Sequence, residues 1–228
     1  MKVILILALT FLAFGCNEIK TALNETPSKV TSGDTTVASS DVTPAVVKPT
    51  ERIALYWENT SAPHPERKPW SDYLVEKVKA KITTYDKAND VTELCPKYKS
   101  LNTHQKLKLW GEFWVALCSF ESSYKPTSAS VDVGTQENKD TWSIGLFQMS
   151  VVDIKNYRIQ NMSYKYDDLL KPLPNIDLAT TIMAHQIEKK GGVFLASGVY
   201  WAPLKIGGKY TRIKEIKALV KARVPACF

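Results

Sequence analysis

The chain contains few of the patterns from which metal, phosphate or nucleic-acid sites are built. Its three histidines, His64, His104 and His185, have no ligand spacing between them, and no glycine-rich phosphate loop occurs. We therefore expect no metal site and no cofactor. Although the net charge is +7, the lysines and arginines form no cluster interleaved with aromatic residues, and zinc-finger and helix-turn-helix patterns are absent. These absences argue against nucleic acid as a partner.

Long apolar runs are absent after the first fifteen residues. Residues 1–15 begin with the charged Lys2, continue through an apolar centre and end in small residues, which is the pattern of an export signal. The apolar centre is too short for a membrane-spanning helix, which needs about 20 apolar residues. We expect residues 1–15 to be a signal peptide and the protein to be exported.

The end of this signal allows two interpretations. Ala13 and Gly15 suit ordinary signal cleavage, whereas a small residue before Cys16 resembles the lipobox of bacterial lipoproteins. We favour the lipobox, although Ala13 stands where that pattern usually has Leu. Cys16 would then carry a lipid that anchors the protein to a membrane. Because Asn17 is not the Asp associated with inner-membrane retention, we expect an outer-membrane lipoprotein facing the periplasm; ordinary cleavage would give a secreted protein.

Composition divides the rest of the chain into two parts. Residues 16–50 are rich in Thr, Ser, Val, Asp and Pro, lack aromatic residues and show no helical or strand period, so they indicate a disordered tether. Residues 1–50 contain as many lysines as acidic residues, which assigns the whole net charge of +7 to residues 51–228. An exported basic domain of this kind is suited to an anionic cell wall.

Helical periods dominate the domain expected over residues 51–228. They predict helices over residues 71–85 with Ser71 as N-cap, 102–124, 152–157, 177–189 and 214–223. The second of these is expected to end near Tyr124, because Lys125 precedes Pro126. Strand signals are scarce, and the best one, over residues 130–134, predicts one arm of a small hairpin. The expected fold class is therefore mainly α, a single helical domain with a minor β-hairpin.

Three cysteines remain besides Cys16, an odd number for an oxidising compartment. Cys95 and Cys227 lie in proline-marked, non-helical stretches, whereas Cys118 lies inside a strong helical pattern. We therefore predict a disulfide between Cys95 and Cys227 and a buried free thiol at Cys118. In the chain-entropy model, closing so long a loop stabilises a domain by up to about 4 to 5 kcal/mol.

A carboxylate occupies the apolar face of the helix expected over residues 102–124. Leu107, Trp110, Trp114, Leu117 and Glu121 fall within about 40° of one line along this helix, at about 100° per residue. A carboxyl group among apolar side chains loses hydration, which raises its pKa and keeps it protonated near neutral pH, as a general acid requires. Alternatively, Glu121 points away from the core in the last turn or pairs with a lysine.

Four motifs follow one another along the chain: residues 121–126 (ESSYKP), 143–150 (SIGLFQMS), 174–176 (PNI) and 200–205 (YWAPLK). Together they resemble the catalytic domain of the soluble lytic transglycosylases, relatives of goose-type lysozyme, and the resemblance covers residues 94–228. The Tyr-Trp motif, a Cys-Pro before the catalytic helix and a C-terminal Cys are similar to one branch of that family. The resemblance implies a lysozyme-like α+β fold and peptidoglycan glycan strands as the partner. We expect a monomer.

The resemblance implies that Glu121 is the catalytic residue. Its carboxyl group would protonate the oxygen that bridges N-acetylmuramic acid and N-acetylglucosamine. The carboxylate would then accept the proton of the muramic 6-hydroxyl, which closes a 1,6-anhydro ring. Ser122 would position the first motif and form a hydrogen bond near the substrate.

The other matching residues are implied to form the substrate-binding surface. Gly145, Leu146 and Gln148 would pack against the catalytic helix and line the sugar cleft. Tyr200 would orient either Glu121 or the N-acetyl group of the substrate. The alternative for each of them is plain core packing.

Two departures from the family pattern bear on the surface and on the mechanism. Phe147 stands where Met is usual, which we expect to alter a sugar-contacting surface. The stretch between the first two motifs is longer and more acidic than is common, and Asp132, Glu137 and Asp140 are candidates for a second carboxylate. An inverting hydrolase needs such a base about 6.5 to 9.5 Å from the acid, whereas a transglycosylase does not.

The alternative for these three acidic residues is that they are solvated turn residues. We favour that alternative, so the sequence predicts a lytic transglycosylase first and a lysozyme second. A third interpretation is an inactive lipoprotein that only binds glycan.

Overall fold

The computed structural model describes residues 51–131 and 137–228. The α-helices within these residues are α1 (Lys68–Ala80), α2 (Ile82–Tyr85), α3 (Val91–Leu94), α4 (Thr103–Glu121), α5 (Val152–Asn156), α6 (Tyr166–Leu169), α7 (Pro172–Lys190) and α8 (Ile213–Arg223). Short 3-10 helices cover Tyr56–Glu58, Pro65–Arg67, Tyr98–Ser100, Lys139–Thr141, Ala202–Leu204 and Pro225–Cys227. No helix in these two ranges is long and apolar enough to cross a membrane. The prediction of a mainly helical fold is confirmed.

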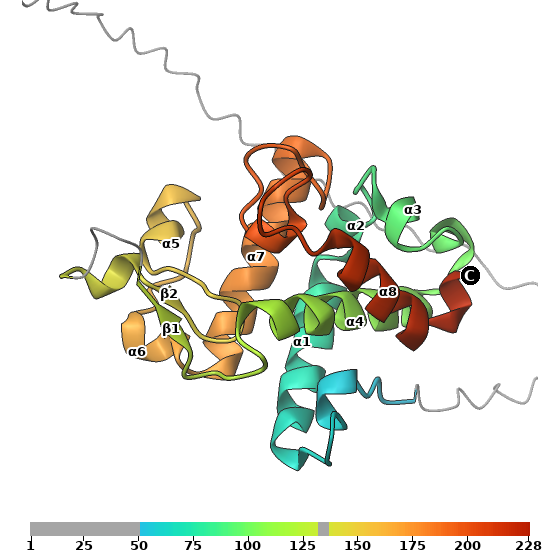
Figure 1. The fold of residues 1–228 in the computed structure, drawn as a ribbon, viewed down its shortest axis with the longest axis horizontal. Helices are drawn as coiled ribbons and strands as arrows, with labels where there is room; N and C mark the ends of the chain where they lie inside the picture. The colour runs from blue at the N-terminus through green and yellow to red at the C-terminus, as the bar shows by residue number, and fades with distance from the viewer. Residues whose placement is uncertain (1–50, 132–136) are drawn as a thin grey trace, which may run out of the picture. The chain divides into compact units, whose positions relative to one another are not determined.

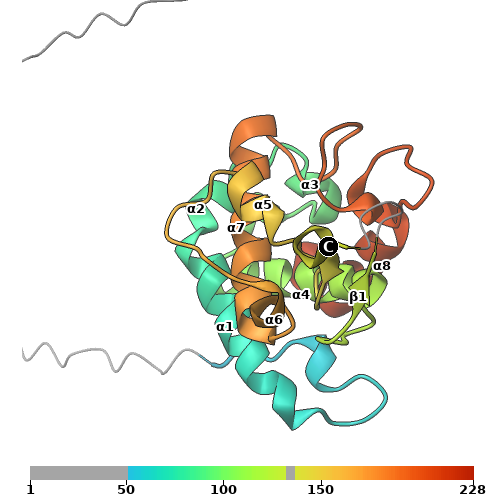
Figure 2. The same ribbon diagram turned by 90° about the vertical axis from the view of Figure 1, so that its left-hand side faces the viewer.

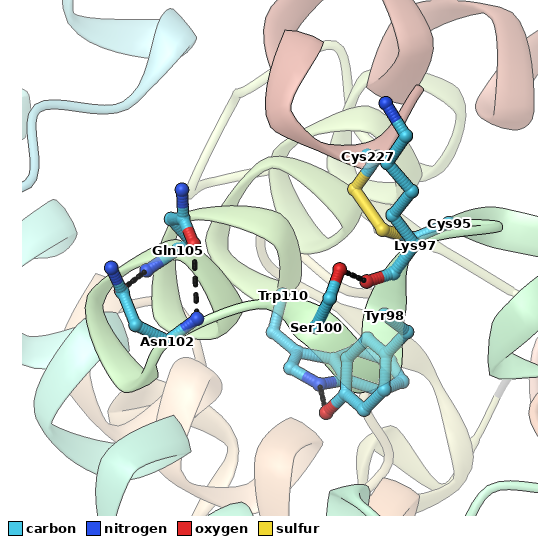
Figure 3. The surroundings of a disulfide bond; sticks show 8 residues. All are labelled: Cys95, Lys97, Tyr98, Ser100, Asn102, Gln105, Trp110 and Cys227. Atoms are coloured by element: carbon cyan, nitrogen blue, oxygen red, sulfur yellow. Dashed lines mark hydrogen bonds between the residues drawn. A yellow bond between two sulfur atoms is a disulfide. The ribbon is translucent and has the colours of Figure 1, made fainter.

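Helix α4 is the central element of the domain. Its start is fixed by a capping box, in which the backbone N–H groups of Gln105 and Asn102 each donate to the other residue's side-chain oxygen at 2.9 Å (Figure 3). Helix α8 packs along α4, α1 packs against α4, and α7 packs against α1 (Figures 1 and 2). The side chains of Trp110, Trp114 and Leu117 are fully buried, so α4 contributes much of the core.

Helix α4 ends at Glu121 rather than at the expected Tyr124. Ser123 and Tyr124 have φ angles of 52° and 64°, in the left-handed region that a right-handed helix cannot contain. The helix therefore stops before the Lys125–Pro126 restriction applies. As a result, Glu121 is the last helical residue, at the point where the chain turns away.

Two helix starts also differ from the prediction. Helix α1 begins at Lys68, so Ser71 is not its N-cap; the buried Ser71 hydroxyl instead accepts a hydrogen bond from Trp57 Nε1 at 2.7 Å. Helix α7 begins at Pro172 rather than at Asp177. A proline lies in the first turn of each helix, where its missing N–H costs no intrahelical hydrogen bond.

The expected hairpin is present but short. Strands β1 (Ala129–Ser130) and β2 (Ser143–Ile144) pair antiparallel, with Ala129 opposite Ile144 and Ser130 opposite Ser143. Residues 132–136, which include most of the predicted strand and the candidate Asp132, lie outside the described residues. Figure 1 shows β1, β2, α5 and α6 grouped around the C-terminal end of α4.

The structure contains the predicted disulfide between Cys95 and Cys227 (Figure 3). The Lys97 backbone N–H also donates to the Cys227 carbonyl oxygen at 3.1 Å. Together these bonds join the C-terminus of the chain to the segment before α4. The thiol of Cys118 is free and buried, as predicted.

Candidate active site

The Glu121 side chain lies at the end of the apolar face of α4. Leu107, Trp110, Trp114 and Leu117 are buried along that face, and Glu121 Oε1 is buried without a hydrogen-bond partner among the described residues. Desolvation raises the pKa of Glu121 from 4.5 to about 7. In the described parts of the chain this carboxyl forms no ion pair, so the alternative of a lysine partner does not hold there.

A second buried carboxyl group on α4 shows what a structural glutamate looks like in this protein. Glu112 is 1% exposed, accepts a hydrogen bond from the Tyr56 backbone N–H at 3.0 Å and pairs with Lys108 Nζ at 2.8 Å. Glu112 Oε2 has no hydrogen bond, but it lies 3.7 Å from Arg223 Nη1. Glu121 lies about two to three turns further along the helix, and its Oε1 has no hydrogen-bond partner among the described residues. Burial without compensation, and not burial alone, distinguishes Glu121.

Ser122 connects the end of α4 to the turn formed by residues 145–148. Its buried hydroxyl donates to the Leu146 carbonyl oxygen at 2.8 Å, and the Cys118 thiol donates to the same oxygen at 3.3 Å. Ser122 therefore connects the first motif to the second, whereas the hydrogen bond near the substrate that the resemblance implies for it stays a prediction.

The turn at residues 145–148 is built around Gly145 and Asn175. Gly145 has φ +77°, and a Cβ atom there would lie 2.3 Å from both Asn175 Nδ2 and the Leu169 carbonyl oxygen. The Asn175 amide donates to the carbonyl oxygens of Ile144 at 2.8 Å and Leu169 at 2.9 Å, and it accepts from the Phe147 N–H at 2.9 Å. Only glycine fits at position 145, and the fully buried Asn175 fixes the turn.

Asn175 is a site residue to which the sequence analysis assigned no role. The Pro-Asn-Ile motif contained it, but its partners lie in the turn 28 to 31 residues earlier in the chain. The only available signal was a polar residue in the first turn of a helix with an apolar face.

Leu146 and Phe147 belong to the core. Neither side chain has any exposed surface, and the Phe147 ring packs edge-on against Trp114 with ring centroids 4.9 Å apart. The expectation that Phe147 alters a sugar-contacting surface is therefore wrong, because the larger ring fills space inside the domain. Leu146 likewise serves packing in this structure.

Gln148 ties the turn to strand β1. It adopts a φ of 51°, and its side-chain amide donates to the Gly145 carbonyl oxygen at 2.9 Å and accepts from the Ser130 hydroxyl at 2.9 Å. The side chain is half-buried, so part of it is accessible beside the turn.

The Tyr200 hydroxyl donates to Asp153 Oδ2 at 2.6 Å, and not to Glu121 as one of the two expectations had it. The Tyr200 backbone N–H donates to Gln186 Oε1 at 3.0 Å. The next residue, Trp201, packs on Trp114 with ring centroids 5.3 Å apart. Tyr200 is thus held beside the turn by two residues, Asp153 and Gln186, that the motifs did not single out.

The candidate second carboxylates are in a different environment. Glu137 and Asp140 are exposed, and Asp132 lies outside the described residues. Across residues 51–131 and 137–228, no group of three or more His, Cys, Asp or Glu side chains is arranged to hold a metal ion.

Fold and site together define a class of protein. A central helix that ends in a carboxyl group whose Oε1 is buried without a hydrogen-bond partner among the described residues, beside a Gly-Leu-x-Gln turn fixed by a buried Asn, describes a lysozyme-like domain. The family model described as the transglycosylase SLT domain matches residues 100–215. The chain belongs to this family, as its four motifs predicted.

Solved structures show the same fold. The chain is similar to Bd0314 DslA, wild-type form 2, with 22% identity and a TM-score of 0.64. Two glutamate-to-glutamine variants of that protein match with 20% and 22% identity and TM-scores of 0.59 and 0.64. Each match covers 78% of this chain and 100% of the other. No curated protein matches the chain. Family membership supports a function of the lytic transglycosylase type that acts on the glycan strands of peptidoglycan.

Proposed function

We propose that the protein is a peptidoglycan lytic transglycosylase in which Glu121 acts first as general acid and then as general base. The observation that carries this proposal is that Glu121 Oε1 is buried without a hydrogen-bond partner among the described residues, and that desolvation raises the carboxyl pKa to about 7. A group with a pKa near the working pH can give up a proton and take it back. Neither step requires a second carboxylate.

In the first step the Glu121 carboxyl donates its proton to the oxygen between N-acetylmuramic acid and N-acetylglucosamine. The bond from muramic C1 to that oxygen breaks, and the N-acetylglucosamine 4-hydroxyl leaves. In the second step the muramic 6-hydroxyl attacks C1 and passes its proton to the Glu121 carboxylate. The 1,6-anhydro product forms without water, and Glu121 is protonated again.

A lysozyme is the second candidate function, and one observation favours it. The two glutamates replaced in the related variants lie eleven positions apart in that chain. Glu121 and Asp132 have the same separation here. This spacing makes Asp132 the foremost candidate for a base that activates water, ahead of the exposed Glu137 and Asp140.

The test compares products released from purified peptidoglycan by wild type, Glu121→Gln and Glu76→Gln. Glu76 is an exposed residue of α1 and controls for the loss of one carboxylate. We expect anhydro-muropeptides from wild type and from Glu76→Gln, and a rate lower by about 10²- to 10⁴-fold in Glu121→Gln. Reducing muramic ends would establish the lysozyme instead. Binding to peptidoglycan without release of soluble products would establish the inactive binding protein.

We further propose that residues 1–15 are removed as a signal peptide, that Cys16 is lipidated, and that residues 16–50 tether a monomeric domain to the periplasmic face of the outer membrane. The sequence patterns described above support this address. In a Cys16→Ser variant we expect the protein to move from the membrane fraction to the soluble fraction. An unchanged distribution would contradict lipidation, and a wild-type protein found outside the cell would favour the secreted alternative.

A further inference from the structure

The corner that follows Glu121 has a backbone conformation that other contacts must hold in place. Ser123 and Tyr124 have φ angles of 52° and 64°, in a region that is unfavourable for residues with a Cβ atom. Ser122 secures one side of this corner through its bond to the Leu146 carbonyl oxygen at 2.8 Å. Because Glu121 is the last residue of α4, the contacts of Tyr124 on the other side also bear on where Glu121 lies.

The Arg67 guanidinium lies over the ring of Tyr124. Its Cζ atom is 5.4 Å from the centroid of that ring and 5.8 Å from the centroid of the Trp70 ring, within the range of a cation–π interaction. The Arg67 side chain is 13% exposed, and its Nε is buried without a hydrogen-bond partner among the described residues, 3.6 Å from the exposed Glu66 carboxylate. Because an aromatic ring attracts cationic N–H groups, the two rings offset the burial of this guanidinium.

Other contacts hold Arg67 itself. Arg67 Nη1 donates to the Trp57 carbonyl oxygen at 2.8 Å, and the fully buried Trp57 ring packs edge-on against Trp70 with centroids 5.8 Å apart. Trp57 Nε1 also donates to the Ser71 hydroxyl of α1, and α1 packs against α4. Arg67 is therefore fixed to the core, and it reaches the first motif from a segment that precedes the family match at residues 100–215.

The charged and titratable groups that meet at the corner come from three parts of the chain. Glu121, Cys118 and Tyr124 belong to α4 and to the turn after it, Arg67 comes from the segment before α1, and Arg223 ends α8. The cause of the raised pKa of Glu121 is desolvation, and no charged group is among its causes. Arg67 therefore influences the Glu121 carboxyl by position rather than by charge.

We propose that Arg67 is a positioning residue for Glu121. Its guanidinium holds the Tyr124 ring against the domain, the ring holds the left-handed corner, and the corner keeps the Glu121 carboxyl at the buried end of the apolar face of α4. Without this support the last turn of α4 opens and water reaches the carboxyl, because the end of a helix lacks the hydrogen bonds of its interior. The inference deepens the proposed function and rests on it.

The test measures the release of soluble products from purified peptidoglycan as a function of pH, with the full chain. Arg67→Met removes the charge but keeps a long side chain, and Arg67→Lys keeps a cation. A general acid acts only while it is protonated, so the kcat/KM of wild type should fall as the pH rises through about 7. In Arg67→Met we expect a kcat about tenfold lower, a KM within about twofold of wild type, and this fall about one pH unit lower. Arg67→Lys should lie between the two.

Two further variants separate this contact from other effects of a lost cation. Tyr124→Leu removes the same contact from the other side and should shift the pH profile as Arg67→Met does. Combining the two changes should produce no further shift, because both remove one interaction. Lys221→Met is the matched control, since Lys221 Nζ lies 5.2 Å from the centroid of the Phe228 ring. This control should have the rate and the pH profile of wild type.

Several results would overturn the inference. An unshifted profile in Arg67→Met would mean that the residue serves stability alone, and a shift toward higher pH would mean that its charge acts on Glu121 directly. Additive shifts in the double variant, or an equal shift in Lys221→Met, would overturn it as well. If Arg67→Met does not fold, an unshifted profile in Tyr124→Leu overturns it alone. If wild type releases no soluble products, it is the proposed function that fails.

Discussion

The carboxyl groups that are candidates for catalysis lie in two regions that differ in burial and in hydrogen-bond partners. At the end of α4, Glu121 follows the buried apolar side chains of one helix face, and its Oε1 is buried without a hydrogen-bond partner among the described residues. In the connection between β1 and β2, Glu137 and Asp140 are exposed, and the Asp140 N–H donates locally to Asn138 Oδ1 at 3.1 Å. The carboxyl group in the first region has lost water and has a raised pKa, whereas the carboxyl groups in the second region are exposed to solvent.

The largest loss of stability is expected at Gly145, in the turn formed by residues 145–148. In Gly145→Ala the new Cβ meets Asn175 Nδ2 and the Leu169 carbonyl oxygen at 2.3 Å, in addition to the strain of φ +77°. We expect the free energy of unfolding to fall by about 4 kcal/mol. Gly207 is the matched control, because it has φ +69° but no atom within 4 Å of the new Cβ. Gly207→Ala should cost only about 1 to 2 kcal/mol.

Denaturant unfolding of both variants under oxidising conditions measures this difference. Equal losses of stability would mean that backbone strain alone acts at Gly145. The close packing between the turn and Asn175 would then not be what holds the site.

The next largest effect concerns the pH dependence of stability. Burial raises the pKa of Glu121 in the folded protein to about 7, above its value of 4.5 in the unfolded chain. The carboxyl therefore stabilises the folded state fully below pH 4.5, and this stabilisation is lost between pH 4.5 and 7 as the unfolded state releases its proton first. The expected loss is about 3 kcal/mol.

This loss is absent in Glu121→Gln, whose side chain does not ionise. Wild type should therefore become less stable relative to Glu121→Gln as the pH rises to 7, and the difference should be constant above it. The check is a series of unfolding curves for both proteins from pH 4 to 9. A constant difference over the whole range would mean that Glu121 has the same pKa in the folded and unfolded protein, and therefore that folding does not desolvate its carboxyl group.

A smaller effect is expected from the hydroxyl that joins α4 to the turn. Ser122→Ala removes the buried bond to the Leu146 carbonyl oxygen, and we expect about 1 to 2 kcal/mol of destabilisation. Ser130→Ala removes the exposed bond from the hairpin to Gln148 and should cost less than about 0.5 kcal/mol. Thermal unfolding measures both. Similar losses would remove the contrast between the two regions.

The sequence predicted those features that depend on local spacing. The apolar face of α4 and its start near residue 102 follow from periodicity, and the pairing of Cys95 with Cys227 follows from their non-helical surroundings. The end of α4 was placed too late, because the left-handed conformations of Ser123 and Tyr124 are set by the turn that they enter.

Contacts between distant segments escaped the sequence analysis for a related reason. Asn175 binds a turn some thirty residues earlier, and Tyr200 binds Asp153 across 47 residues. Neither partner is marked by composition or period, since each is a common polar residue whose role depends on tertiary packing alone. Phe147 was misjudged in the same way, because a motif position does not tell whether its side chain faces the core or the substrate.

The smallest effect on stability, and the one that decides the mechanism, is expected in the hairpin connection. Because Glu137 and Asp140 are exposed, Glu137→Gln and Asp140→Asn should each change the free energy of unfolding by less than about 0.5 kcal/mol. If the protein is a transglycosylase, these variants and Asp132→Asn should also release anhydro-muropeptides at nearly the wild-type rate, since Glu121 performs both proton transfers. A lysozyme would instead lose activity by about 10²-fold or more in the one variant that lacks its base. Asp132→Asn is the variant in which we would expect that loss, and a loss of activity without a loss of stability would identify Asp132 as the second carboxylate.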